Sequence, residues 1–142
     1  MICLVLGGAY CLCISVSDVL DVKVGALGVL QLKPGKYIYV GSALNGLEAR
    51  VRRHVNTSQG DFKALHWHID YLLKEPKVAI SSVLVKTTSE RIECELAEQV
   101  MQHGSPVRGF GCSDCRCVSH LFKVDDCHFL LDEGLELWSP HT

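Results

Sequence analysis

The hydrophobic pattern of the chain changes at Gly41, and this change limits the folds that the sequence can adopt. Before Gly41, apolar and β-branched residues come in short runs separated by glycine, which is typical of strands. After it, Leu47, Val51 and Val55 recur at every fourth position and predict one apolar face of an α-helix. This part of the chain is therefore expected to run from a strand through a glycine turn into a helix.

The other patterns predict strands and helices in irregular order. Strands are expected over residues 9–16, 37–41, 78–86, 121–124 and 128–131, with a hairpin of residues 20–24 and 26–32 between the first two. Helices are expected from about residue 45, over 65–74, and beyond the potential N-caps at 87–89, while residues 56–63 suggest a loop. This order is typical of an α+β domain with a small sheet.

Length and composition place the chain among globular domains. Its 142 residues suit one domain spanning 1–142, and 48% of them are hydrophobic. The formal net charge of −2 excludes a protein that coats nucleic acid by bulk charge, although it allows a local basic groove. The apolar N-terminus has no basic residue before it and is too short to cross a membrane. We therefore expect a cytoplasmic protein without membrane contact, in which the cysteines are reduced thiols or metal ligands.

Two tyrosines and two basic residues carry the chemistry that this pattern suggests. Tyr10 lies in one predicted strand and Tyr39 in the strand that ends at Gly41, so both phenols can share a sheet face. Arg50 and His54 are four positions apart and project side by side from the following helix. A guanidinium holds a phosphate in a bidentate fork, and a phenol or imidazole can relay the proton of an attacking water. These four side chains are therefore suited to binding and hydrolysing a phosphodiester.

The same residues resemble the motifs of the GIY-YIG nuclease superfamily. Gly8-Ala9-Tyr10 and Tyr39-Val40-Gly41 stand where that superfamily has its two tyrosine tripeptides, and a helix with Arg50 and His54 follows. The blocks HWHIDYLL, ECELA and GFGCSDCRCVSHLF resemble a small prokaryotic branch, the Uri-like endonucleases, so that the resemblance covers about residues 7–123. The resemblance implies a small, mostly antiparallel sheet flanked by helices. It also implies a metal-dependent endonuclease that hydrolyses DNA phosphodiester bonds in repair or processing. Other DNA-repair proteins are the partners that it implies.

The resemblance also implies roles for individual residues. Tyr10 is expected to act on the nucleophilic water, Tyr39 to hydrogen-bond near the scissile phosphate, and Gly41 to keep the turn open. Arg50 is expected to stabilise the pentavalent phosphate, and His54 stands where the family has a His or Tyr.

A glutamate on a later helix holds one divalent metal in the family, and two glutamates compete for that role. Glu93 and Glu95 lie on opposite edges of the predicted apolar stripe through Leu96, so helix geometry alone leaves both open. The family's glutamate is followed by core residues three and four positions later, which favours Glu93. A carboxylate suits Mg²⁺ or Mn²⁺, which prefer oxygen ligands.

Three features depart from the family pattern. The first tripeptide is GAY, and the connection between Tyr10 and Tyr39 is long enough to contain an inserted hairpin. The late asparagine of many members has no clear counterpart, and Ser113 and Asp114 are the candidates to replace it.

Cysteines gather in one short block near the C-terminal end. The spacing of Cys112, Cys115, Cys117 and His120 can supply four zinc ligands. Structural zinc sites usually take their ligands from two separated segments, however. We therefore expect hydrogen bonds of polar side chains to hold this turn, and structural zinc is not favoured.

Further polar side chains are candidates to contact DNA. Ser42 follows the second tyrosine motif, and Arg53 lies on the same predicted helix as Arg50. Lys36, His66 and His68 complete this group. On a helix, His66 and His68 would point to different faces, so a shared metal is not expected, and a role in supporting the site is slightly favoured over direct contact with substrate.

Two other functions fit the sequence. A catalytically weak nucleic-acid-binding accessory module is consistent with the near-neutral charge and the missing asparagine. A small zinc-stabilised interaction protein rests on the cysteine block alone. The sequence leaves open which DNA structure is cut, whether RNA is a substrate, and the oligomeric state.

Overall fold

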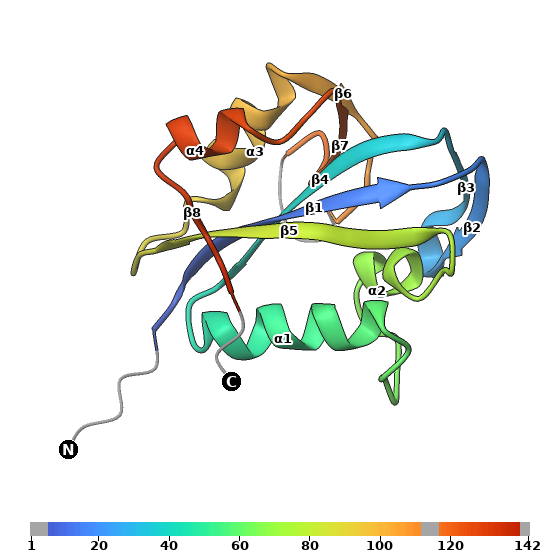
Figure 1. Cartoon of the computed structure of the whole chain (residues 1–142), viewed down its shortest axis with the longest axis horizontal. Coiled ribbons are helices and arrows are strands. Elements are labelled where there is room, and N and C mark those ends of the chain that lie inside the picture. Colours follow the sequence, from blue (N-terminus) through green and yellow to red (C-terminus); the bar gives the residue numbers. More distant parts are fainter. Residues whose placement is uncertain (1–5, 112–116, 140–142) are drawn as a thin grey trace.

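Strand β1 (Gly8–Val16) lies inside a six-stranded antiparallel sheet, whose strands follow the order β6-β7-β4-β1-β5-β8. The computed structural model describes residues 6–111 and 117–139 (Figure 1). β1 pairs with β4 on one side and with β5 on the other, and both pairings are antiparallel. The bounds of the remaining strands of this sheet are Gly35–Ala43 for β4, Val78–Thr87 for β5, Gly104–Pro106 for β6, Leu121–Val124 for β7 and Glu136–Leu137 for β8.

Helices cover both faces of the sheet, and each face has its own hydrophobic core (Figure 1). Tyr10 and Leu12 of β1 point to the face that packs against α1 (Leu47–Ser58) and α2 (His68–Leu73). Cys11 and Cys13 point to the opposite face, against α3 (Glu93–Met101) and α4 (Phe129–Asp132). The alternation follows from the two-residue period of a strand, and it explains why almost every residue of β1 is buried.

The hairpin expected between the two tyrosine strands is present. β2 (Leu20–Val24) and β3 (Gly28–Leu32) form a separate two-stranded antiparallel sheet, joined by a 3₁₀ turn over Gly25–Leu27. β2 contacts α2, and its buried positions join the same core as Tyr10. The insertion therefore extends the core that lies beneath the tyrosine face of the main sheet.

Several element boundaries differ from the sequence-based expectation. Residues 128–131 were expected as a strand, but α4 occupies most of them, because a short apolar run has no period that distinguishes a helix turn from a strand. Residues 56–58 belong to α1 rather than to a loop, since the hydroxyls of Thr57 and Ser58 bond back to carbonyls of the helix. The strand expected to end at Gly41 continues to Ala43.

The N-cap expected for the third helix is also wrong. The residue before α3 is Ile92, which makes no side-chain capping bond. The hydroxyl of Thr88 instead accepts a hydrogen bond from the amide of Glu90 in the preceding turn. The short strands β6 and β8 had no sequence signal, because two or three residues cannot display a period. No helix in the described part of the chain is long and apolar enough to cross a membrane.

A buried carboxylate joins α1 to α2. Asp70 is fully buried, and its oxygens accept hydrogen bonds from the guanidinium of Arg53 at 2.9 and 3.1 Å. They also accept bonds from the backbone amides of His66 and Trp67, at 2.7 and 2.9 Å, which caps the start of α2. Burial opposes ionisation, but these hydrogen bonds outweigh it and lower the pKa of Asp70. The His66–Asp70 pair suggested by the sequence is thus a backbone contact, because His66 precedes the helix.

Removal of this carboxylate should destabilise the fold. Asp70→Ala leaves Arg53 and two amides without their acceptor, and we expect the free energy of unfolding to fall by about 3 kcal/mol. Urea unfolding at neutral pH measures this loss. Glu48→Ala is the matched control, because it breaks the exposed Glu48–Arg52 pair on α1, the helix that carries Arg53, and it should cost less than about 1 kcal/mol. Equal losses in the two variants would contradict the structural role of Asp70.

Candidate active site

A hollow of about 230 Å³ opens where β1 begins and β4 ends, and residues of α1 and of the start of α3 contribute to its lining. It brings together side chains from segments that are far apart in the sequence. The residues that line it are Tyr10, Tyr39, Val40, Gly41, Ser42, Arg50, Trp67, Arg91, Glu93, Gly111 and His120.

The antiparallel register of β1 and β4 places the two tyrosines together. Tyr10 lies opposite Gly41, and Leu12 lies opposite Tyr39, so the tyrosines are diagonal neighbours on one face. Their ring centroids are 6.4 Å apart. The sequence-based expectation that both phenols share a sheet face is confirmed.

Gly41 is required by the close approach of Tyr10. A Cβ atom at this position would lie 2.5 Å from both Cζ and the hydroxyl oxygen of Tyr10, well inside van der Waals contact. Gly41 lies within β4 and pairs with Tyr10, so it does not form the open turn that the family resemblance implied. Its absent side chain instead provides the space in which the Tyr10 ring lies.

Tyr10 forms a buried hydrogen bond with His54. The distance between the Tyr10 hydroxyl oxygen and His54 Nε2 is 2.6 Å, and each residue is only 1% exposed. Burial raises the pKa of Tyr10, and the neighbouring Tyr39 adds to this effect. Burial also lowers the pKa of His54 to about 4, with repulsion from Arg50 contributing and Asp70 opposing. Both groups are therefore neutral at physiological pH.

The second ring nitrogen of His54 has no hydrogen-bond partner among the described residues. Nδ1 is buried, and the ring contacts Trp67 edge-on, with centroids 6.0 Å apart. Among the described residues, the hydrogen-bond partner of the imidazole is the Tyr10 hydroxyl, which Nε2 faces. This arrangement couples the protonation of His54 to the phenol.

Arg50 reaches the hollow from α1. Its Nη1 donates a hydrogen bond of 3.3 Å to the carbonyl of Ser42, and its guanidinium lies 4.4 Å from the centre of the Trp67 ring. These contacts fix a half-buried positive charge beside the tyrosine pair. A guanidinium in this position can bind an anionic group that enters the hollow.

Glu93, at the start of α3, lines the hollow, whereas Glu95 is exposed and does not. The hydroxyl of Ser42 donates a hydrogen bond to Glu93 Oε2. No basic side chain of the described residues forms an ion pair with this carboxylate. The two glutamates that helix geometry left equivalent are therefore distinguished by the tertiary structure, and Glu93 is the one that shares a cavity with Arg50.

Four of the residues expected to contact DNA lie outside this hollow. Arg53 binds Asp70 and lies 4.3 Å from the Trp67 ring. His68 accepts a hydrogen bond from the amide of Gly111 through Nδ1, so it supports the loop that carries Gly111. His66 is exposed and contacts the edge of Trp67, and Lys36 lies on the opposite face of β4, beside Cys127.

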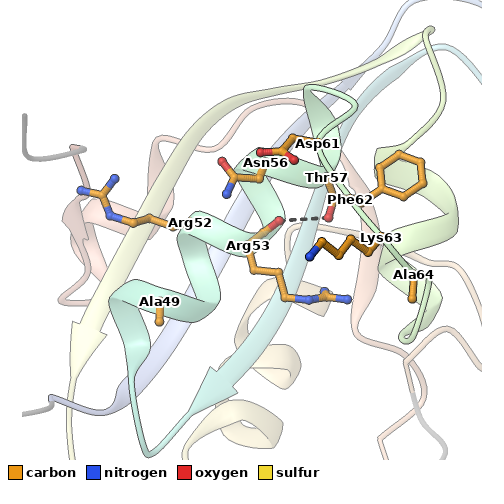
Figure 2. A pocket seen from close by; sticks show the side chains of 9 residues that line it. All are labelled: Ala49, Arg52, Arg53, Asn56, Thr57, Asp61, Phe62, Lys63 and Ala64. Atoms are coloured by element: carbon orange, nitrogen blue, oxygen red, sulfur yellow. Dashed lines mark hydrogen bonds between the residues drawn. The ribbon is translucent and has the colours of Figure 1, made fainter.

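Arg53 borders a second, larger hollow on the outer side of α1. Figure 2 shows its guanidinium directed away from Arg52 and toward the segment that carries Lys63 and Ala64. The hollow has a volume of about 590 Å³, and basic side chains from α1 and from this segment line it together with Asp61. This surface shares no lining residue with the tyrosine hollow, and two of its basic side chains, Arg52 and Arg53, form ion pairs with Glu48 and Asp70.

Sequence reasoning missed Trp67, Arg91, Gly111 and His120 as members of the tyrosine hollow. His120 was expected only as part of the cysteine block. The positions of these four residues depend on long-range packing, which a local pattern does not encode. Cys112, Cys115, Ser113 and Asp114 lie outside the described residues.

The chain belongs to the family described as a domain of unknown function, DUF123, which matches residues 9–139. No curated protein and no solved structure matched the chain.

The buried imidazole makes stability depend on pH. The pKa of His54 is about 4 in the folded protein and near its ordinary 6.5 in the unfolded chain. The unfolded chain therefore binds more protons between these values, and stability falls as the pH falls through this window. From pH 7 to about pH 4.5, the loss attributable to His54 should be about 2 kcal/mol.

The measurement compares urea unfolding of the wild type and His54→Gln across this range. Glutamine can still hydrogen-bond to Tyr10 but does not titrate. Over this pH range, the free energy of unfolding of the variant should therefore fall by about 2 kcal/mol less than that of the wild type. Parallel pH dependences in the two proteins would show that His54 is not the buried neutral group described here.

Proposed function

We propose that this domain is a GIY-YIG-type endonuclease that uses a divalent metal to hydrolyse DNA phosphodiester bonds in repair or processing. One observation carries the proposal. Tyr10, Tyr39, Arg50 and Glu93 come from β1, β4, α1 and α3, yet all line one hollow of about 230 Å³. These are the residues that the resemblance assigns to catalysis, and their convergence supports that assignment.

Arg50 supplies the charge that a phosphodiester needs. Its guanidinium is held by Ser42 and Trp67 before any ligand arrives, so little reorganisation is required when a phosphate binds. In the pentavalent transition state the phosphate oxygens gain negative charge, and a fixed donor stabilises that state more than the ground state. Tyr39, on the adjacent strand, can donate a hydrogen bond to the same phosphate.

Tyr10 and His54 are suited to take a proton from the attacking water. A neutral phenol is a weak base, but its oxygen can accept the water proton while its own proton passes to His54 Nε2, 2.6 Å away. The water oxygen then forms the bond to phosphorus as the bond to the leaving oxygen breaks. The pKa of about 4 opposes protonation of His54, and the negative phosphate beside it would raise that pKa.

Glu93 fits the divalent ion that the resemblance implies. Its carboxylate faces the hollow, forms no ion pair with a described basic residue, and is oriented by the Ser42 hydroxyl. A site with one carboxylate suits Mg²⁺ or Mn²⁺, which retain several waters. When bound, such an ion stabilises charge on the phosphate and on the leaving oxygen.

Arg50→Ala should separate catalysis from binding. We expect cleavage of nicked, branched or single-stranded DNA to fall by about 100-fold or more, because a preorganised charge donor is lost. DNA affinity should change by less than about threefold, since other basic residues remain. Arg52→Ala, an exposed neighbour on the same helix, is the control and should cleave normally. Wild-type cleavage rates in Arg50→Ala would refute the assigned role.

The two glutamates provide a second test of the proposal. Glu93→Gln removes the charge that holds the metal and should abolish Mg²⁺- or Mn²⁺-dependent cleavage, whereas the exposed Glu95→Gln should be fully active. Inactive Glu95→Gln with active Glu93→Gln would overturn the metal assignment. If the wild type binds DNA but cuts none of these substrates with either ion, the accessory binding module is the better description.

A further inference from the structure

Three side chains that suit a soft metal ion meet between α3 and the segment that leads into β7. The potential ligand atoms of Cys94, Cys117 and His120 all lie within 4.8 Å of one another. Cys94 is in the first turn of α3, while Cys117 and His120 precede β7. Two separated segments thus contribute to the group. Structural zinc sites usually have this arrangement, which the cysteine block alone does not provide.

We infer that Cys94, Cys117 and His120 bind one Zn²⁺ ion that ties the start of α3 to the segment before β7. Bonds of about 2.3 Å to sulfur and 2.0 Å to nitrogen place tetrahedral ligands roughly 3.5–3.8 Å apart. The three atoms, which lie within 4.8 Å of one another, therefore need to approach by at most about 1.3 Å. Two thiolates and a neutral imidazole balance the charge of the ion. Thiolate and imidazole ligands select zinc over Mg²⁺, which prefers oxygen.

His120 is oriented as a metal ligand should be. Its Nδ1 lies 3.0 Å from the carbonyl oxygen of Val40, so the proton belongs on Nδ1 and Nε2 is the nitrogen that can bind a metal. The backbone of His120 is also fixed, because its carbonyl accepts from the amide of Val40 and its amide donates to the carbonyl of Phe110. A ligating histidine that donates its other N–H to a carbonyl is the usual outer-shell arrangement of zinc sites.

The site lies next to the tyrosine hollow but is chemically distinct from it. Cys94 directly follows Glu93, and His120 also lines the hollow. Successive helix residues point about 100° apart, so one can face the thiol cluster while the other faces Arg50. The N-cap of α3 makes no side-chain hydrogen bond, and a zinc ion bound at Cys94 would fix this helix end. The inference does not depend on nuclease activity.

Metal analysis of the full chain tests the site. Protein purified without added metal or chelator should contain about one zinc per chain by mass spectrometry. C94S, C117S and H120N should each lose most of this zinc. C127S is the matched control, since Cys127 packs against the opposite end of β1 and β4, beside Cys13, and should keep it. E93Q should also keep it, because the carboxylate belongs to the other site.

Two measurements on the wild type avoid the risk that a variant fails to fold. A strong chelator should release the zinc and lower the melting temperature by about 10 °C, and zinc but not Mg²⁺ should restore it. Cobalt substituted for zinc should show thiolate-to-metal charge-transfer absorption. Protein without zinc that binds neither zinc nor cobalt, or C94S that keeps one zinc per chain, would overturn the inference.

Discussion

The hydrogen bond between Tyr10 and His54 is the contact on which the geometry of the tyrosine hollow depends. It joins a strand inside the sheet to a helix that covers the sheet, and both partners are removed from water. A buried hydroxyl or imidazole that loses its partner costs roughly 1–3 kcal/mol, so each group holds the other in place. The contact also requires Gly41, because any larger residue opposite Tyr10 would occupy the space of its ring. Strand register, helix position and side-chain orientation are therefore linked at one point.

Two positive charges lie near this contact, and they have different environments. Arg53 and Arg50 both lie against Trp67, but Arg53 is bound by the buried Asp70, so its charge is compensated within the fold. Arg50 has a carbonyl as its partner, which leaves its charge directed at the hollow. Two arginines three positions apart on one helix thus differ in what their charges do. A count of basic residues along α1 does not reveal this difference.

The sequence was sufficient where a feature depends on local period or on strand register. The helix with Arg50 and His54 and the inserted hairpin follow from patterns within a few residues. The shared face of Tyr10 and Tyr39 also needs the pairing of β1 with β4, which the two predicted strands made possible. The sequence was insufficient where packing decides. Arg53 was expected to contact DNA because no local pattern shows that Asp70 lies beside it, and Lys36 was grouped with the site although the pleat of β4 turns it to the other face. α4 was missed because one helix turn has too few residues to display a period.

Glu93 and Cys94 are neighbours in the first turn of α3, but their side chains belong to two different groups of residues. A hard carboxylate and a soft thiol in successive positions point to different surroundings, one toward the tyrosine hollow and one toward Cys117 and His120. A zinc ion on the thiol side would immobilise the backbone from which the carboxylate projects. A site that must hold a reacting phosphate in place gains from such support, because misplacement of a functional group by about 1 Å reduces catalysis severely. A zinc ion bound by Cys94, Cys117 and His120 would thus restrain the helix that carries Glu93, while Tyr10 and Tyr39 are held in the core on the other face of the sheet.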